Sequence, residues 1–246
     1  MMQNVANTLR ALEEVAALQP VGVADLARAL DLPKSSVQRS LVTLHATGWI
    51  RPAGGTPTRW VVTAKALHVG RHATDELGLR DAALPVMEEL RERTDETVHL
   101  AVREGGKVLL VERLQTSKAV RIILPLGQDL PMHASANGKA VLAADPDDAI
   151  RRYLDEGLPR YTDTTVTDRE QLLAEVREIR ACGYATNGGE WRTDVSAVAS
   201  AVIGTEGLPV ASVSVNVPTS RMTPEATVTF GGLVREAARA ISARIS

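Results

Sequence analysis

The chain is poor in aromatic residues and cysteine, and it has no long apolar run. Tryptophan, tyrosine and phenylalanine make up 3% of its 246 residues, which argues against a protein that stacks single-stranded nucleic acid on aromatic side chains. The single cysteine, Cys182, excludes an internal disulfide and favours a cytoplasmic protein. No apolar run reaches the length of a membrane span, and the first residues lack the character of a signal or transit peptide.

The common signatures of enzymes and metal sites are also missing. The sequence has no Gly-x-Ser-x-Gly, no His-Glu-x-x-His, no P-loop and no His/Cys cluster with metal-ligand spacing. His133 is a candidate general base, although a lone histidine is more often structural. Glu190 and Asp194 form a candidate carboxylate pair without a nearby nucleophile, and Cys182 lies at a predicted helix C-terminus, which disfavours a thiolate. We therefore expect no enzyme, no cofactor and no metal.

Charge is distributed unevenly along the chain. The formal net charge is −2. Residues 23–71 contain seven basic and two acidic residues, a net charge of +5, whereas the chain from residue 72 onward carries −6. Such an asymmetry indicates that the basic part meets nucleic acid. The length and the charge division together favour two domains.

Residues 23–44 (VADLARALDLPKSSVQRSLVTL) predict two short helices joined by a tight turn. In the second helix Val37, Leu41 and Leu44 follow the helical period and are expected to face inward. Pro33 suits the first turn of that helix, where its missing N–H costs nothing. The opposite face carries small hydroxyls and one arginine, which fits a helix that enters the DNA major groove.

A predicted β-hairpin follows the two helices. Residues 48–51 and 59–62 read as strands, and the Gly/Pro-rich residues 52–58 (PAGGTPT) as the turn between them. A helix-turn-helix with such a wing is a winged helix, in which Trp49 and Trp60 would be core anchors. The candidate DNA-binding residues are Arg28, Lys34, Ser35, Ser36, Gln38, Arg39, Thr43, Arg51 and Arg59. An ordinary two-helix hairpin with a solvated polar face would show the same pattern.

The rest of the chain alternates helices with pairs of strands. We expect helices over residues 64–77, 79–93, 134–143 and 167–182, with another from residue 145 and a last one from Thr223-Pro224 to the C-terminus. We expect strands over residues 97–102, 107–113, 120–125, 195–203 and 209–217. This order predicts an α+β fold with a largely antiparallel sheet flanked by helices. The expected domains are residues 1–63, a linker helix over 64–78, and residues 79–246.

Four segments carry a resemblance to a known family. They are LARALDLPKSSVQRSLVTLHATGWI, PLGQDLPMHASANGKAVLA, GYATNGGE and SVSVNVPTSRM, and their order and spacing make the match specific. Over essentially its full length the chain resembles the IclR family of bacterial transcriptional regulators. The resemblance implies a winged helix-turn-helix, a linker helix and a GAF-like domain that binds a small organic acid. It also implies dimers or tetramers that repress or activate at palindromic operators.

The resemblance further implies a set of effector-binding residues. They are Leu130, Met132, Ala136, Asn137, Asn187, Glu190, Ala197, Ser214 and Asn216. Ser214 and Asn216 are two positions apart in a predicted strand, so both point to the same face. Ser135 and Gly138 open a predicted helix, whose free N–H groups favour an anion such as a carboxylate.

Two positions depart from the family pattern. Asp194 and Ala201 stand where family members commonly have glycine and proline. Asp194 at a pocket mouth would disfavour an anionic ligand unless its side chain turns outward. The sequence as a whole predicts a transcriptional regulator that binds double-stranded DNA, itself and a small-molecule effector, with no membrane partner. The alternatives are a small-acid-processing enzyme with an appended DNA-binding domain and a ligand-free architectural DNA binder.

Overall fold

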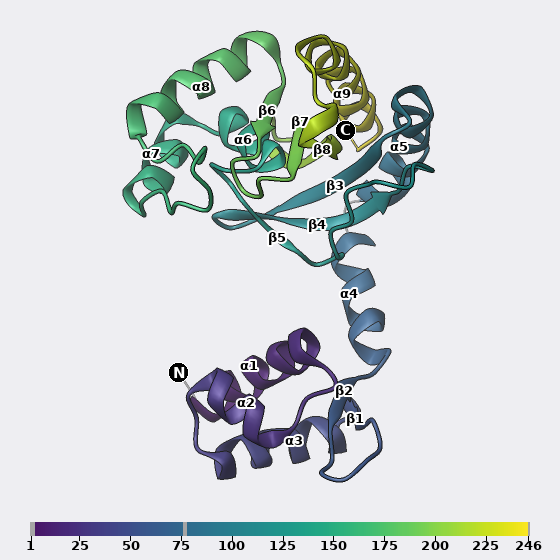
Figure 1. Cartoon of the computed structure of the whole chain (residues 1–246), viewed down its shortest axis with the longest axis vertical. Helices are drawn as coiled ribbons and strands as arrows, with labels where there is room; N and C mark the ends of the chain where they lie inside the picture. Colours follow the sequence, from purple (N-terminus) through teal and green to yellow (C-terminus); the bar gives the residue numbers. More distant parts are fainter. Residues whose placement is uncertain (1–2, 76–77, 246) are drawn as a thin grey trace. The chain divides into compact units, whose positions relative to one another are not determined.

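The chain folds as two units, Met1–Glu76 and Leu77–Ser246, which we call the N-terminal and C-terminal units (Figure 1). The structure is a computed structural model and describes residues 3–75 and 78–245. Residues 76 and 77 of the predicted linker lie outside the described residues. Within these described parts, no helix combines the length and apolar character needed to cross a membrane.

The N-terminal unit contains the predicted helix-turn-helix and hairpin. Its elements are α1 (Gln3–Leu18), α2 (Val23–Leu30), α3 (Lys34–Ala46), β1 (Ile50–Pro52), β2 (Trp60–Val62) and α4 (Lys65–Asp75). Val37, Leu41 and Leu44 of α3 are buried in one core with Leu26 and Trp60, which confirms the predicted inward face. The predicted connecting helix is α4.

The hairpin is anchored by Trp60. β1 and β2 pair antiparallel with Ile50 opposite Val62, and Trp60 exchanges two backbone hydrogen bonds with Val21 at 3.1 and 2.8 Å. The Trp60 side chain is buried, as predicted for a core anchor. Gly54 in the turn has a φ of +88°, a left-handed conformation that favours glycine. The basic side chains of the hairpin therefore project from a strand pair fixed to the rest of the unit.

The C-terminal unit is an antiparallel sheet with helices on both faces. Its helices are α5 (Leu79–Thr94), α6 (Ala136–Ala144), α7 (Asp147–Asp155), α8 (Arg169–Cys182) and α9 (Pro224–Ile245), with a 3-10 turn at Thr219–Arg221. Its strands are β3 (Thr97–Glu104), β4 (Lys107–Leu114), β5 (Asp129–Pro131), β6 (Ala185–Gly188), β7 (Val195–Ile203) and β8 (Pro209–Pro218), in the spatial order β5-β4-β3-β8-β7-β6. The predicted α+β class is confirmed.

The strand predicted over residues 120–125 is wrong. Ile122 and Leu124 are buried and Ile123 is exposed, so burial alternates as it does in a strand. The segment nevertheless is not part of any β-sheet. On the outer edge of β4, the chain that follows this segment takes the backbone groups of Leu110, which exchanges hydrogen bonds of 2.8 and 3.0 Å with Gly127 and Gln128. The next strand on that edge is β5, which pairs Leu130 with Val108.

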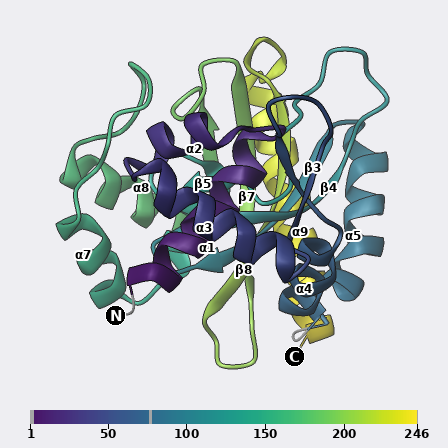
Figure 2. The ribbon, with the colours of Figure 1, turned by 90° about the horizontal axis from the view of Figure 1, so that it is seen from below.

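The two faces of the six-stranded sheet have different coverings. α5 and α9 lie next to each other on one side of the sheet (Figure 2). They pack over aliphatic side chains that include Val98, Leu100, Val213 and Val215. α6 packs against β7 and β8, and its Asn137 contacts the opposite face. Because successive strand residues point to opposite faces, the residues between these aliphatic positions form a second buried surface.

Candidate DNA-binding and effector-binding sites

The face of α3 opposite its buried residues is open to solvent. Lys34, Ser35, Gln38, Arg39 and Thr43 are exposed, and Ser36 is half-buried. The Arg39 guanidinium donates a hydrogen bond of 3.3 Å to the Ser36 hydroxyl, and the Thr43 hydroxyl donates one of 3.0 Å to the Arg39 carbonyl. Arg39 is thus held along the helix surface with most of its donors free for another partner.

Val42 is a residue of this face that the sequence analysis missed. Its side chain is 56% exposed, and it lies four residues after Gln38 and three after Arg39, which places it on the same face. An exposed apolar side chain among polar ones is the kind of group that meets a thymine methyl in the major groove. The helical spacing from Gln38 and Arg39 was the signal that could have identified it.

The remaining basic candidates come from three other parts of the N-terminal unit. The Arg28 side chain on α2 is 80% exposed and pairs with Asp25 at 3.5 Å. Arg51 on β1 is exposed. Arg59, just before β2, is exposed and donates a hydrogen bond of 3.0 Å to the Pro20 carbonyl. All three cations are solvent-accessible, as contact with phosphates requires.

The second buried surface of the sheet is polar. We call Thr97, His99, Ser212, Ser214 and Asn216 the polar sheet face. The register places Asn216 beside Thr97 and Ser214 beside His99 on the two central strands. These five side chains are at most 4% exposed. Ser214 and Asn216 therefore share one face as predicted, and the polar surface continues onto β3.

Several atoms of this surface lack a hydrogen-bond partner. Among the described residues, they are the Thr97 hydroxyl and both ring nitrogens of His99, together with Nε of the neighbouring Arg113. Burial, and secondarily the positive charge of Arg113, lowers the pKa of His99 to about 3, so its ring is neutral at ordinary pH. A buried polar atom without a partner costs about 1–3 kcal/mol. The alternation of Thr97 and His99 with apolar residues in β3 was the sequence signal for them.

Three amides border or belong to the same surface, each with a defined partner. Asn137 on α6 donates to the Ser212 hydroxyl at 3.0 Å. Asn187 on β6 donates to the Ala134 carbonyl at 2.9 Å, and Asn216 donates to the Ser214 hydroxyl at 2.8 Å. Ala197 lies opposite both Asn187 and Asn216 in the sheet, and Ala136 packs against it. The structure thus gathers six of the nine predicted effector residues around the polar sheet face.

The other predicted effector residues have different surroundings. The Glu190 carboxylate accepts two hydrogen bonds of 2.8 Å from Lys139, which also pairs with Glu175 at 2.9 Å. Burial raises the pKa of Glu190, and the Lys139 charge opposes that rise. Leu130 and Met132 are buried in an apolar cluster with Val141 and Leu142 of α6. Glu190 therefore has a cationic partner before any ligand arrives.

The start of α6 is fixed by a close backbone approach. The Ser135 hydroxyl accepts a hydrogen bond of 3.0 Å from the Gly138 N–H. A Cβ on Gly138 would lie 2.4 Å from the Met132 Cα, a distance that no side chain tolerates. Only glycine fits here, so the first turn of α6 packs directly on the chain that leads into it.

The candidate catalytic groups are engaged in structural contacts. His133 is 1% exposed, with Nδ1 2.6 Å from the Tyr153 hydroxyl and Nε2 2.9 Å from the Pro159 carbonyl. The Asp194 side chain is 65% exposed and pairs with Arg192, so it turns outward. Over residues 3–75 and 78–245, no cluster of histidine, cysteine, aspartate and glutamate has the arrangement of a metal site.

Comparison with known proteins places the chain in a family. Residues 71–243 match the model of the bacterial transcriptional regulator IclR C-terminal domain. The chain belongs to the IclR family of transcriptional regulators. Residues 5–54 match the IclR helix-turn-helix domain, so both units have counterparts in the family, and the resemblance inferred from the four sequence segments is confirmed.

Relatives and solved structures of the family align over nearly the whole chain. The HTH-type transcriptional repressor AllR of Klebsiella pneumoniae is 35% identical over 221 residues, which are 89% of this chain and 81% of AllR. An IclR transcriptional regulator from Alicyclobacillus acidocaldarius superposes with a TM-score of 0.88 at 26% identity and full coverage of both chains. An IclR homologue from Microbacterium hydrocarbonoxydans, solved with 4-hydroxybenzoate, has a TM-score of 0.81 at 26% identity and 98% coverage of each chain.

Proposed function

We propose that this regulator binds its operator through α3 and is controlled by a small polar organic compound, preferably an acid, held on the polar sheet face. The observation that supports this most directly is the set of unpartnered polar atoms on a fully buried sheet surface. Such atoms are costly to leave unpaired, so their presence calls for a partner. A bound ligand would supply that partner.

On the DNA side, Ser35, Arg39 and Thr43 would contact base edges in the major groove, with Ser36, Gln38 and Val42 beside them. Arg28, Lys34, Arg51 and Arg59 would hold phosphates. A dimer or tetramer would present two such helices to the half-sites of a palindromic operator. A regulator of bacterial genes would act in the cytoplasm, where its target DNA lies.

On the effector side, the neutral His99 ring and the Thr97 hydroxyl can each donate or accept a hydrogen bond. Ser214 and Asn216 lie directly beside them in the register. Nε of Arg113 adds a cationic donor from β4, which suits a carboxylate. Asp194 turns away from this region, so it does not oppose an acid. The 4-hydroxybenzoate complex of a homologue is consistent with such a ligand.

The ligand would act by favouring one arrangement of the DNA-binding units over another. A ligand shifts such an equilibrium only by its difference in affinity for the two arrangements. The connecting helix α4 (Lys65–Asp75) is the last element of the N-terminal unit and would transmit the change.

A two-step experiment tests the proposal. The purified chain is screened against small organic acids by thermal shift, and each hit is added to a gel-shift assay with the DNA upstream of its own gene. We expect a hit to raise the Tm, with about 2.7 kcal/mol of stabilisation at a hundred times its Kd, and to change DNA affinity. DNA binding that no acid alters would instead support an architectural protein, and turnover of the acid would support an enzyme.

Matched variants then locate the ligand. Asn216→Ala should weaken the hit at least about tenfold, since a hydrogen bond to a polar ligand is lost. Ser200→Ala is the control, because Ser200 lies on β7 opposite Val213 and its hydroxyl bonds to the Gly183 carbonyl at 2.8 Å. Equal effects of the two substitutions would show that the ligand binds elsewhere.

A further inference from the structure

A separate cavity opens beside β5 and α7 in the C-terminal unit. Its volume is about 490 Å³, within the range of roughly 300–1,000 Å³ that is typical of small-molecule sites. We call it the aromatic cavity, because Tyr153, Tyr161 and Trp191 line it together with Met132, His133 and Glu156. Leu130 and Met132 also belong to the predicted effector residues, but none of the polar sheet face lines this cavity.

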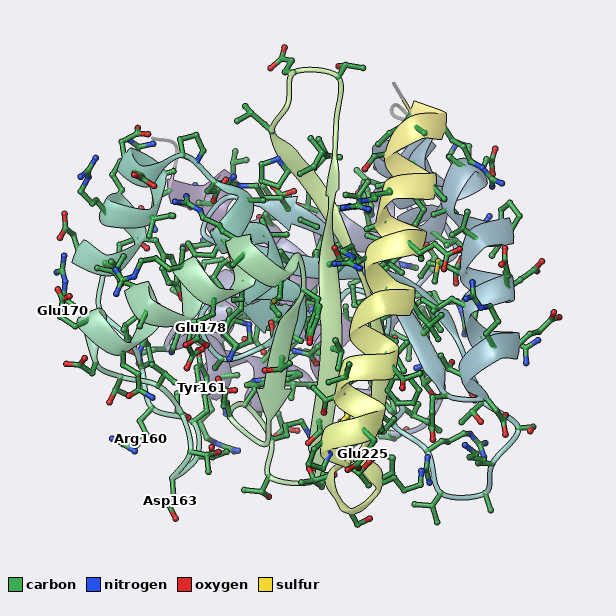
Figure 3. The ribbon with its side chains drawn as sticks, turned by 90° about the horizontal axis from the view of Figure 1, so that it is seen from above. Arg160, Tyr161, Asp163, Glu170, Glu178 and Glu225 are labelled. Atoms are coloured by element: carbon green, nitrogen blue, oxygen red, sulfur yellow. The ribbon has the colours of Figure 1, made fainter. Side chains whose placement is uncertain are left out.

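The concentration of aromatic rings here is unusual for this sequence. The whole chain has three tryptophans, three tyrosines and one phenylalanine, and three of these seven side chains line the one cavity. The ring of His133 lies 5.8 Å from that of Tyr161 and 6.1 Å from that of Tyr153, centre to centre. Figure 3 labels Tyr161, together with Arg160 and Asp163, on the loop that leads from α7 to α8.

These rings are partly open to solvent although they are apolar. Tyr161 is 46% exposed, and Tyr153 and Trp191 are half-buried. His133 is buried beneath them, with both ring nitrogens engaged. The cavity thus has a fixed polar floor and accessible aromatic walls, an arrangement that can receive a ligand without unfolding its lining.

The charge of the lining is negative. Lys107 and Asp129 form an ion pair with each other at the rim, so their charges cancel. Glu156 also lines the cavity, and within the described residues its carboxylate has no cationic partner. Burial raises the pKa of Tyr153 to about 12, against the hydrogen bond from the His133 backbone N–H, which lowers it; Tyr161 and Glu156 add smaller increases. The Tyr153 hydroxyl therefore stays neutral, and Glu156 is the uncompensated charge of the site.

We propose that the aromatic cavity is a second ligand site, which binds a small organic ammonium compound. The faces of aromatic rings attract cations, and the Glu156 carboxylate adds a direct counter-charge. An organic acid would meet repulsion from Glu156 and would find its cationic neighbour, Lys107, already paired with Asp129. The chemistry of this site is thus opposite to that of the polar sheet face.

Isothermal titration calorimetry on the full chain tests the site with two probes. Benzyltrimethylammonium carries a ring and a permanent positive charge, whereas phenylacetate carries a ring and a negative charge. We expect the cation to bind with one-to-one stoichiometry and phenylacetate to leave the cavity empty. Phenylacetate that competes with the cation, or a cation that gives no binding heat, would overturn the proposal.

Two pairs of variants assign the binding to these residues. Glu156→Gln should weaken the cation about tenfold, while Glu170→Gln, at an exposed carboxylate in the first turn of α8, should leave it unchanged. Tyr161→Leu should weaken it several-fold, while Tyr161→Phe retains the ring and the affinity. Equal binding by all four variants would refute the assignment. DNA is absent from these titrations, so the result is independent of the proposed regulatory function.

Discussion

The exposed face of α3 and the polar sheet face follow the same sequence principle but end in different surroundings. Each is the polar side of an element whose other side is buried among aliphatic residues. On α3 the polar groups of Ser35, Gln38 and Arg39 reach solvent, where water satisfies them. On the sheet, His99 and Thr97 are fully buried and keep atoms without partners.

The difference separates two kinds of binding surface. A solvated polar face costs little stability, so its composition is free to follow the DNA that it contacts. A buried polar face lowers stability wherever its groups are unpaired, so a protein retains it only for a specific partner. Substitutions on the two faces should therefore act on different quantities, the affinity for DNA on α3 and the stability or ligand response on the sheet.

The largest expected effect contrasts two neighbours on β3. Leu100 lies in the aliphatic core and His99 on the polar sheet face. Leu100→Ala should lower the free energy of unfolding of the C-terminal unit by about 2–5 kcal/mol through lost burial and the cavity left behind. His99→Leu should change it by less than about 1 kcal/mol, or raise it, because no hydrogen bond is lost.

Urea unfolding followed by circular dichroism measures both changes on the transition of the C-terminal unit. The unsubstituted chain is the reference. The slope of the unfolding free energy against urea concentration should be the same in both variants as in this reference. A loss for His99→Leu as large as that for Leu100→Ala would show that His99 supports the fold, and the contrast between the two faces would be lost.

An intermediate effect is expected on α3. Arg39→Ala should reduce operator affinity by about 1–3 kcal/mol and relax sequence preference, because Arg39 projects from the exposed face. Its Tm should stay close to that of the unsubstituted chain, since only the 3.3 Å contact with Ser36 is lost.

Arg28→Ala is the matched control for Arg39→Ala, since Arg28 is also exposed but lies on α2. It should weaken binding to all sequences alike and flatten the salt dependence. Gel shifts on specific and scrambled DNA at two salt concentrations distinguish the two behaviours. If the Arg39→Ala variant still prefers the operator over scrambled DNA, α3 is not the helix that contacts the bases.

The smallest expected effect is a pH dependence. His99 has a pKa of about 3 in the folded chain and about 6.5 when unfolded, so the unfolded chain binds the extra proton between these values. Stability from this group is complete above the unfolded pKa and is lost as pH falls toward 3. Between pH 7 and pH 5 we expect a loss of roughly 1–2 kcal/mol that His99→Leu lacks. If the free energy of unfolding changes equally with pH in the unsubstituted chain and in His99→Leu, the buried, neutral state of His99 is contradicted.

The elements of both units were largely predictable from local pattern. The helical period placed Val37, Leu41 and Leu44 in the core, and the long β runs predicted over residues 195–203 and 209–217 match β7 and β8. The error over residues 120–125 has a clear cause. Ile122 and Leu124 alternate with exposed residues as strand residues do, but whether they join a ladder depends on which backbone groups β4 still has free.

The candidate sites were predictable to different degrees. Those on α3 follow from one helix, so helical spacing alone identified Arg39 and its neighbours and could have identified Val42. The polar sheet face needs the register of β3 against β8, which brings His99 beside Ser214 across more than a hundred residues. Local spacing carries no information about that pairing.

From the order of the residues alone, a winged helix and an antiparallel sheet could be predicted, because periodic burial and turn chemistry act over a few neighbouring positions. The family followed from the resemblance of four sequence segments. The tertiary structure alone decided which polar groups are left without partners and which aromatic rings surround one cavity. Both depend on contacts between distant segments, such as Met132, Tyr153 and Trp191, whose meeting is fixed only when the sheet and helices pack together.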